Sequence, residues 1–237
     1  MSGPSEAGPG SSAGPIDGNA WPARLTARVV DPGPPARIHG YEVDADLALR
    51  YRFTDLLRLA LAGELPTDAQ GRAFDLALQL LAPIDVSTAP AHAGVLARTC
   101  GARSSATIAI SALALAEHAR HLVAGHAPLL QWLDDPRGPL PTAFVTADTE
   151  EAAAVDRIRA AVHDTGLDVP ALSERPTRPA ALLSIVHACG LRRAEQIEAV
   201  LVMARMPCVL AEAFATTVVG FQDYPMRLPP FRHEEIR

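Results

Sequence analysis

Hydrophobic positions recur at helical spacing along most of this chain. Between residues 51 and 62 they form one stripe, which consists of Phe53, Leu56, Leu57, Ala60 and Leu61. Because residues three and four apart share a helix face, this stripe predicts an amphipathic helix. Gly63 is suited to end that helix in a left-handed conformation, and Pro66 prevents its continuation.

The same periodicity predicts a series of further helices. Thr67 is a favourable N-cap for the next one, Asp68 adds a negative charge to its first turn, and Pro83 ends it. Its apolar face consists of Phe74, Leu78 and Leu81. Later helices are predicted over residues 89–100, 150–163, 179–189 and 194–219, with a bend in the last at Pro207.

The segments outside these helices have a different character. Short β-like pieces at Leu25–Val30 and Ala36–Val43 are separated by a Pro- and Gly-rich turn, and residues 134–141 have the composition of a linker. Residues 1–20 are predicted to be a disordered tail, and residues 221–237 an extended arm. The sequence shows neither an alternating strand series nor a glycine-rich phosphate loop, so we expect an all-α protein.

The segment Ser104–Leu133 predicts a central helix that begins with apolar residues and ends in histidines, with Ser104 or Ser105 as its N-cap. Its first half is made of small and aliphatic residues, a pattern that suits close contact with another helix across a subunit boundary. Three histidines follow within nine positions: His118, His121 and His126. The helix is expected to present all three on a similar side, at a polar cleft.

Composition narrows the choice of function. The chain has 237 residues, 49% of them hydrophobic and only 5% aromatic, which favours an alanine- and leucine-filled helical core. The net charge is −6 with scattered basic residues, so we expect no nucleic-acid partner. No apolar run reaches the roughly 20 residues needed to span a bilayer. Three separated cysteines without metal-ligand spacing predict free thiols and a cytoplasmic location.

The segment Arg37–Thr67 resembles the citrate synthase superfamily, and most of all its short citryl-CoA lyase-type members. The resemblance rests on Gly40 and Tyr41 in an early turn and on the corner Gly63–Thr67. It continues through Met203–Phe214 and Tyr224–Leu228. It implies a helical fold with a large domain over residues 21–140 and 205–237 and a small inserted domain over residues 141–204. It also implies a dimer with its active site between the lobes.

In that family an aspartate removes a proton from the acyl-CoA methyl group, and two histidines polarise the reacting oxygens. Aligned with this chain, the first histidine falls at His121 or, in another register, His118. Neither position has the two glycines that follow the family's histidine. The second histidine is replaced by Thr146 or a neighbour, and the aspartate by Pro179 or Ala180. Asp168 and Glu174 are only distant substitutes.

Arginines clamp the substrate's carboxylates in the family, and their planar fork suits that task. The matching candidates here are Arg205, Arg227 and Arg232. Arg205 could equally pair with a helix-terminal acid, and the two late arginines could equally lie on the surface. No HExxH pattern accompanies the histidines, so we expect no metal site, and the histidines could simply be solvated side chains at a helix end.

Three functions remain open on this basis. The first is a non-catalytic paralogue that acts as a partner subunit of an active homologue, or that binds CoA or a carboxylate. The second is an active enzyme that forms or cleaves a carbon–carbon bond of an acyl-CoA, using a rearranged site around His118 and His121. The third is a helical enzyme of another class with only architectural likeness. The expected ligand is a small carboxylate or a CoA thioester, with no covalently bound cofactor, and the expected assembly is a homodimer or a heterodimer.

Overall fold

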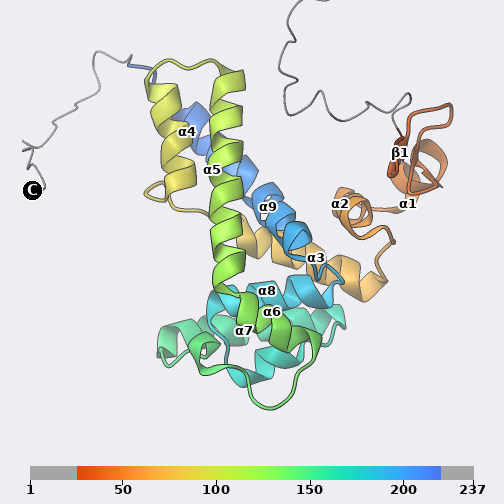
Figure 1. Ribbon diagram of the computed structural model, residues 1–237, viewed down its shortest axis with the longest axis vertical. Helices are drawn as coiled ribbons and strands as arrows, with labels where there is room; N and C mark the ends of the chain where they lie inside the picture. The colour runs from red at the N-terminus through yellow and green to blue at the C-terminus, as the bar shows by residue number, and fades with distance from the viewer. Residues whose placement is uncertain (1–25, 220–237) are drawn as a thin grey trace, which may run out of the picture.

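The computed structural model describes residues 26–219, and within that range the fold is built from helices (Figure 1). The expected tail at residues 1–20 and the expected arm at residues 221–237 lie outside the described residues. The main helices are α2 (Phe53–Ala62), α3 (Asp68–Leu81), α4 (Ala89–Thr99), α5 (Ser104–Gly125), α6 (Ala127–Asp134), α7 (Thr149–Thr165), α8 (Arg178–Ala188) and α9 (Ala194–Ala215). The all-α prediction is confirmed.

Short elements precede α2 and connect the later helices. A small antiparallel sheet with strand order β1-β2-β3 is formed by β1 (Val30–Asp31), β2 (Arg37–Ile38) and β3 (Tyr41–Glu42). It is followed by the π-helix η1 (Val43–Leu47) and the single turn α1 (Ala48–Arg50), and the 3-10 helices η2 (Thr142–Phe144) and η3 (Pro170–Glu174) flank α7. The predicted β-like segment 36–43 is therefore a hairpin that turns at His39 and Gly40, both with positive φ.

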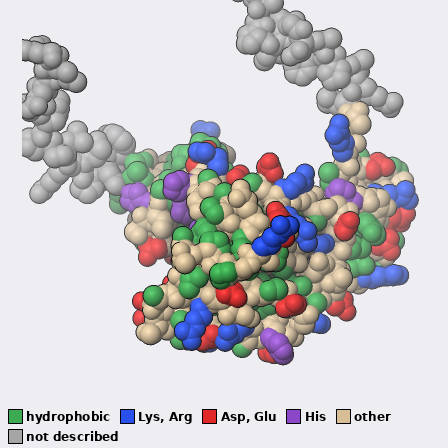
Figure 2. All heavy atoms as spheres, turned by 60° about the horizontal axis from the view of Figure 1, so that its bottom comes forward, with side chains coloured by type: hydrophobic (Ala, Val, Ile, Leu, Met, Phe, Trp, Pro, Cys, Tyr) green, Lys and Arg blue, Asp and Glu red, His purple; other side chains and the backbone are tan. Residues whose placement is uncertain are grey.

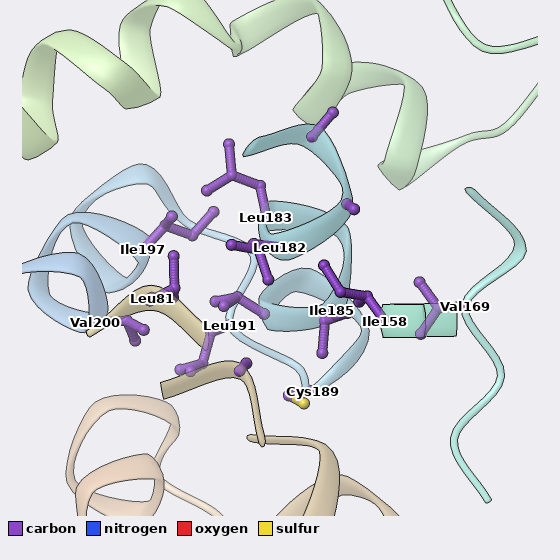
Figure 3. Close-up of a cluster of buried hydrophobic side chains, with 14 of the residues drawn as sticks. Leu81, Ile158, Val169, Leu182, Leu183, Ile185, Cys189, Leu191, Ile197 and Val200 are labelled. Atoms are coloured by element: carbon purple, nitrogen blue, oxygen red, sulfur yellow. The ribbon is translucent and has the colours of Figure 1, made fainter. Parts of the chain in front are cut away.

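The helices pack in two neighbouring groups. Helices α4, α5 and α9 contact one another, while α3 contacts α7, α8 and α9 (Figure 1). The main hydrophobic core lies in the second group and includes Leu81, Ile158, Leu183, Ile185 and Ile197 (Figure 3). It continues from α3 through α7 and α8 into α9. The boundaries of the two expected domains, at residues 140 and 205, remain predictions.

The corner motif in the sequence forms a structural joint between α2 and α8. Gly63 ends α2 with a φ of 84°, which favours glycine. Arg58, almost fully buried, donates from Nε to the carbonyl oxygen of Cys189 (2.6 Å) and from Nη1 to that of Glu64 (2.7 Å). Thr67 begins α3 as a capping box with Gln70, as its N-cap role predicted. This motif thus specifies packing.

The helix predicted to begin with apolar residues and to end in histidines is α5, which ends at Gly125, and a separate helix, α6, starts at Ala127. His126 joins them with φ −107° and ψ 11°, outside helical geometry. Pro128 lies in the first turn of α6, where its missing N–H costs nothing, whereas it would break a continuous helix. The prediction that Ser104 or Ser105 caps this helix is wrong, because Arg103 is its N-cap. The side chain of Arg103 makes no capping hydrogen bond.

Candidate functional site

The three histidines of the central segment do not form one cluster. His118 is half-buried and His121 is exposed, both near the end of α5. His126 lies beyond that end, where its ring stacks on Phe144 with 5.3 Å between centroids and its Nδ1 lies 2.8 Å from the carbonyl oxygen of Leu122. His126 therefore lies past the end of the helix that carries His118 and His121.

His118 lies close enough to Arg205 of α9 to be affected by its charge. The pKa of His118 is lowered from its ordinary value, first because partial burial disfavours the imidazolium form and then because Arg205 and His121 add positive charge. Acidic side chains do not contribute to this shift. His118 is thus held neutral at physiological pH, and a neutral imidazole has one N–H to donate.

The guanidinium group of Arg205 lies next to mainly apolar side chains. Its Nε donates to the carbonyl oxygen of Leu81 at 3.4 Å, and burial lowers its pKa. An arginine nevertheless remains protonated under all physiological conditions. Among residues 26–219 it forms no ion pair with an acid, so the alternative that it pairs with a helix-terminal carboxylate is not what the described part of the chain shows.

A cavity of about 140 Å³ lies next to Arg205. Apart from Pro83 and Pro179, its apolar wall is formed by leucines from α3, α5, α8 and α9, namely Leu80, Leu81, Leu122, Leu182, Leu183 and Leu201. Arg178 and Arg205 supply its polar lining, and none of the described residues that line it is acidic. Arg178 was not predicted as a site residue.

The first turn of α8 forms one edge of this cavity, and its backbone donors are already used. The N–H of Arg178 donates to Oε1 of Glu151 at 2.8 Å, and the N–H of Ala180 donates to Oγ1 of Thr177 at 3.4 Å. Pro179, between them, has no N–H to offer. The family resemblance aligns the proton-abstracting aspartate with Pro179 or Ala180, and neither residue offers a carboxylate or an unused N–H donor.

Thr146, aligned with the second family histidine, lies near the same helix end. Its Oγ1 donates to Oε2 of Glu151, and its N–H donates to the carbonyl oxygen of Arg175 at 3.0 Å. Glu151 of α7 thus connects Thr146 to the start of α8. It was missed in the sequence because it lies 27 residues from Arg178 and belongs to no motif.

The remaining candidates lie elsewhere. Asp168 borders a separate cavity next to α7, and Glu174 is exposed at the end of η3. Arg227 and Arg232, predicted as substrate-binding, lie outside the described residues.

Within residues 26–219 no group of three or more His, Cys, Asp or Glu side chains is placed to hold a metal ion. In the same range no helix is both long and apolar enough to cross a membrane.

The fold matches solved structures of enzymes that act on citryl-CoA or citrate. Citryl-CoA lyase from Hydrogenobacter thermophilus aligns with a TM-score of 0.64 and 16% identity, over 90% of this chain and 97% of that one. ATP citrate lyase from Methanothrix soehngenii, solved with citrate and coenzyme A, aligns with a TM-score of 0.52 and 10% identity. A mutant ATP citrate lyase from Methanosaeta concilii, solved with (3S)-citryl-CoA, gives 0.52 and 11%.

The two ATP citrate lyase alignments cover 91% of this chain but only 43% of those much longer proteins. No protein-family model and no curated protein matches the sequence. At 10–16% identity the likeness establishes the fold. The chain has the citrate synthase-like helical fold of citryl-CoA lyase, as the sequence resemblance implied.

Proposed function

We propose that this chain is a carboxylate-binding protein on the citryl-CoA lyase fold that lacks the acid–base set for citrate synthase-type chemistry. One observation carries the proposal. Pro179 or Ala180 stands where the family resemblance expects the base, and Pro179 lines a cavity whose polar side chains are Arg178 and Arg205. A pocket with cations and no acid is equipped to bind an anion rather than to remove a proton from carbon.

Glu151 does not supply the missing base in this arrangement. Proton abstraction requires a base within hydrogen-bond reach of the substrate. Both carboxylate oxygens of Glu151 already accept hydrogen bonds, one from the backbone N–H of Arg178 and one from the hydroxyl of Thr146. Glu151 instead caps α8, and its negative charge interacts favourably with the positive end of the helix dipole.

The ligand class follows from the cations and from the structural neighbours. Two guanidinium groups on one cavity suit a carboxylate, because their planar fork binds it through two parallel hydrogen bonds. The ATP citrate lyases of the same fold were solved with citrate and coenzyme A and with (3S)-citryl-CoA. A small carboxylate or a CoA thioester is therefore the ligand that we propose for this chain.

The polarity of α5 supports a second subunit as partner. In its first half Ile108, Ile110 and Leu113 are 42%, 41% and 68% exposed, whereas Thr107 and Ser111 are buried. A helix with its large apolar side chains outward and its hydroxyls inward gains stability when another protein surface covers it. We propose that this face forms the dimer contact, with a second copy or with an active paralogue.

Free thiols support the cytoplasm as the location. Cys100, Cys189 and Cys208 are all unbonded. Burial raises the pKa of the Cys189 thiol to about 12, so it stays protonated and unreactive. Reduced cysteines are typical of proteins in reducing compartments.

An active enzyme with a rearranged site is the alternative, and His118 favours it. A neutral imidazole near Arg205 combines a hydrogen-bond donor with a carboxylate clamp, two groups that a reaction on an acyl-CoA needs. In this alternative Glu151 would have to leave its cap and act as the base.

Two measurements test the proposal. Purified protein should form no citrate from acetyl-CoA and oxaloacetate, and cleave no citryl-CoA, above the buffer rate in a thiol-release assay. A turnover that disappears in His118→Ala or His121→Ala would establish the active alternative. In a thermal-shift series, CoA, acetyl-CoA, citrate and oxaloacetate are compared with smaller carboxylates. At least one of these ligands should raise Tm in the wild type but not in Arg205→Met, because a ligand that binds only the native state raises Tm by mass action; no shift with any of them would overturn the proposal.

A further inference from the structure

We infer that the cavity beside Arg205 binds a small apolar monocarboxylate of about six carbon atoms rather than a tricarboxylate such as citrate. This inference rests on the proposed carboxylate-binding function and specifies its ligand. It follows from the number of charged groups, the lack of free backbone donors, and the size and chemistry of the wall.

The charges fit one carboxylate. Arg178 and Arg205 are the cations on the cavity, and Arg178 is exposed whereas Arg205 lies deeper, against the carbonyl oxygen of Leu81. A single carboxylate can satisfy the guanidinium of Arg205 through two hydrogen bonds. A tricarboxylate would leave at least one further charge against leucine side chains, and a buried charge without a partner is strongly unfavourable.

The head of α8 offers no compensation for additional charge. A helix N-terminus often binds anions through its free N–H groups. Here the N–H of Arg178 binds Glu151, the N–H of Ala180 binds Thr177, and Pro179 has none. The anion must therefore be held by arginine side chains, since His118 and His121 are not among the described residues that line the cavity.

The wall and the volume fit a compact apolar group. Six leucines from four helices surround a space of about 140 Å³. A leucine- and phenylalanine-lined cavity of roughly 150 Å³ in another protein stays dry and binds benzene. A benzoate, or a branched aliphatic acid of similar size, would place its ring or alkyl group among the leucines and its carboxylate on Arg205.

Calorimetric titration of the full chain tests this inference with matched probes. Benzoate and 4-methylpentanoate are compared with citrate, oxaloacetate and CoA, and with the neutral isosteres benzyl alcohol and 4-methylpentanol. We expect the two apolar acids to bind and the isosteres to bind about tenfold more weakly or not at all, since a charged hydrogen bond is lost. Citrate is expected not to bind at the same concentrations.

Two variants locate the site. Arg205→Met keeps the length of the side chain, removes its charge, and is expected to weaken benzoate binding about tenfold or more. Leu122→Phe leaves both arginines in place but fills the cavity, so it should weaken binding even if Arg205→Met fails to fold. Arg157→Gln on the exposed surface of α7 is the matched control and should bind as the wild type does.

The outcomes separate the two proposals. Binding of citrate, oxaloacetate or CoA that depends on Arg205, without binding of the apolar acids, overturns the ligand inference and leaves the carboxylate-binding function standing. Equal binding of acids and neutral isosteres also overturns the inference. If no anion binds in an Arg205-dependent manner, the proposed function fails as well.

Discussion

His118 shows how a single side chain responds to its surroundings. Its imidazole is half-buried at the end of α5, near the guanidinium of Arg205. Burial and the neighbouring positive charge both act against protonation, so the folded protein binds this proton less readily than the unfolded chain does. The stability of the protein is therefore linked to pH through this residue.

We predict that His118 destabilises the protein under mildly acidic conditions. At pH 8 the imidazole is neutral in both states and contributes nothing. As pH falls through 6.5, the ordinary pKa, the unfolded chain takes up the proton first, so the free energy of unfolding decreases. The loss stops growing once pH is below the lowered pKa of the folded state.

Urea denaturation of wild type and His118→Gln at several pH values measures this effect. The difference in unfolding free energy should shift in favour of the variant between pH 8 and pH 5. His92→Gln, at an exposed position on α4, is the control. A difference that stays constant with pH for His118→Gln would contradict the assignment.

Part of the site could be predicted residue by residue from sequence. The family pattern aligns Arg205 with a carboxylate-binding arginine and Pro179 or Ala180 with the base; Arg205 and Pro179 line the same cavity, and their roles stay predictions. Arg178 and Glu151 could not be found in this way. Their roles depend on how α7 packs against the start of α8, and no local pattern records a contact between residues 27 positions apart.

At the scale of secondary-structure elements, helices α4 and α5 are in close contact at Gly94 and Ser111. A Cβ atom added at Gly94 would lie 2.5 Å from Oγ of Ser111, a buried hydroxyl with no hydrogen-bond partner in the described structure. In an ordinary helix, Gly→Ala stabilises by about 1 kcal/mol. Here we predict that Gly94→Ala destabilises by about 1–3 kcal/mol, because the added methyl group fits only if the buried Ser111 hydroxyl turns to another rotamer or the helices shift.

A double-mutant cycle checks this contact. Ser111→Ala removes the clashing oxygen and an unsatisfied hydroxyl, so Gly94→Ala should cost much less in that background. The free energies of unfolding of the wild type, both single variants and the double variant are compared in urea. Purely additive effects would show that the two residues do not meet.

The outward face of α5 gives a prediction about assembly. Leu113→Asp places a charge at a 68% exposed position and should convert a dimer to monomers at micromolar concentration without lowering the stability of the monomer. Sedimentation velocity measures the change. Leu49→Asp on α1, at a 75% exposed position, is the matched control. If both variants stay dimeric, the contact lies elsewhere; if the wild type is a monomer, the dimer proposal fails.

Helix existence was predictable from the sequence, and most errors occurred at helix ends. The stripe in α2 and the caps at Gly63 and Thr67 gave α2 and α3 nearly to the residue. Gly125 and Pro128 are the local signals that α5 ends here. Pro128 has no N–H to donate to the carbonyl oxygen of Ala124, and its ring would clash with that oxygen in a continuous helix, which explains why α6 starts anew.

At the scale of the whole molecule, Arg58 joins two segments that lie 131 residues apart in the sequence. It reaches from α2 to the carbonyl oxygen at residue 189, beyond α8, and is only 4% exposed. We predict that Arg58→Met destabilises the protein by about 3 kcal/mol, because it leaves the carbonyl oxygens of Cys189 and Glu64 without a donor. Arg72→Met, which removes one bond to Thr165, should cost less. Equal losses in urea denaturation would contradict this.

The fold was recognisable because the motif that carries the resemblance specifies packing. Gly63 and Thr67 end one helix and begin the next, and Arg58 fixes the corner to α8. These residues say nothing about the reaction, since one fold supports several functions. The ligand that is bound depends instead on the few side chains that line the cavity.

The proline at position 179 also affects how this chain can change over evolutionary time. Its fixed φ suits the first turn of α8 and reduces the freedom of the denatured chain, so it favours the native state. An aspartate at this position would give up that contribution, but its negative charge in the first turn of α8 would offset the loss through the helix dipole. The two residues therefore differ little in stability, and a substitution here would mainly change the charge at the edge of the cavity.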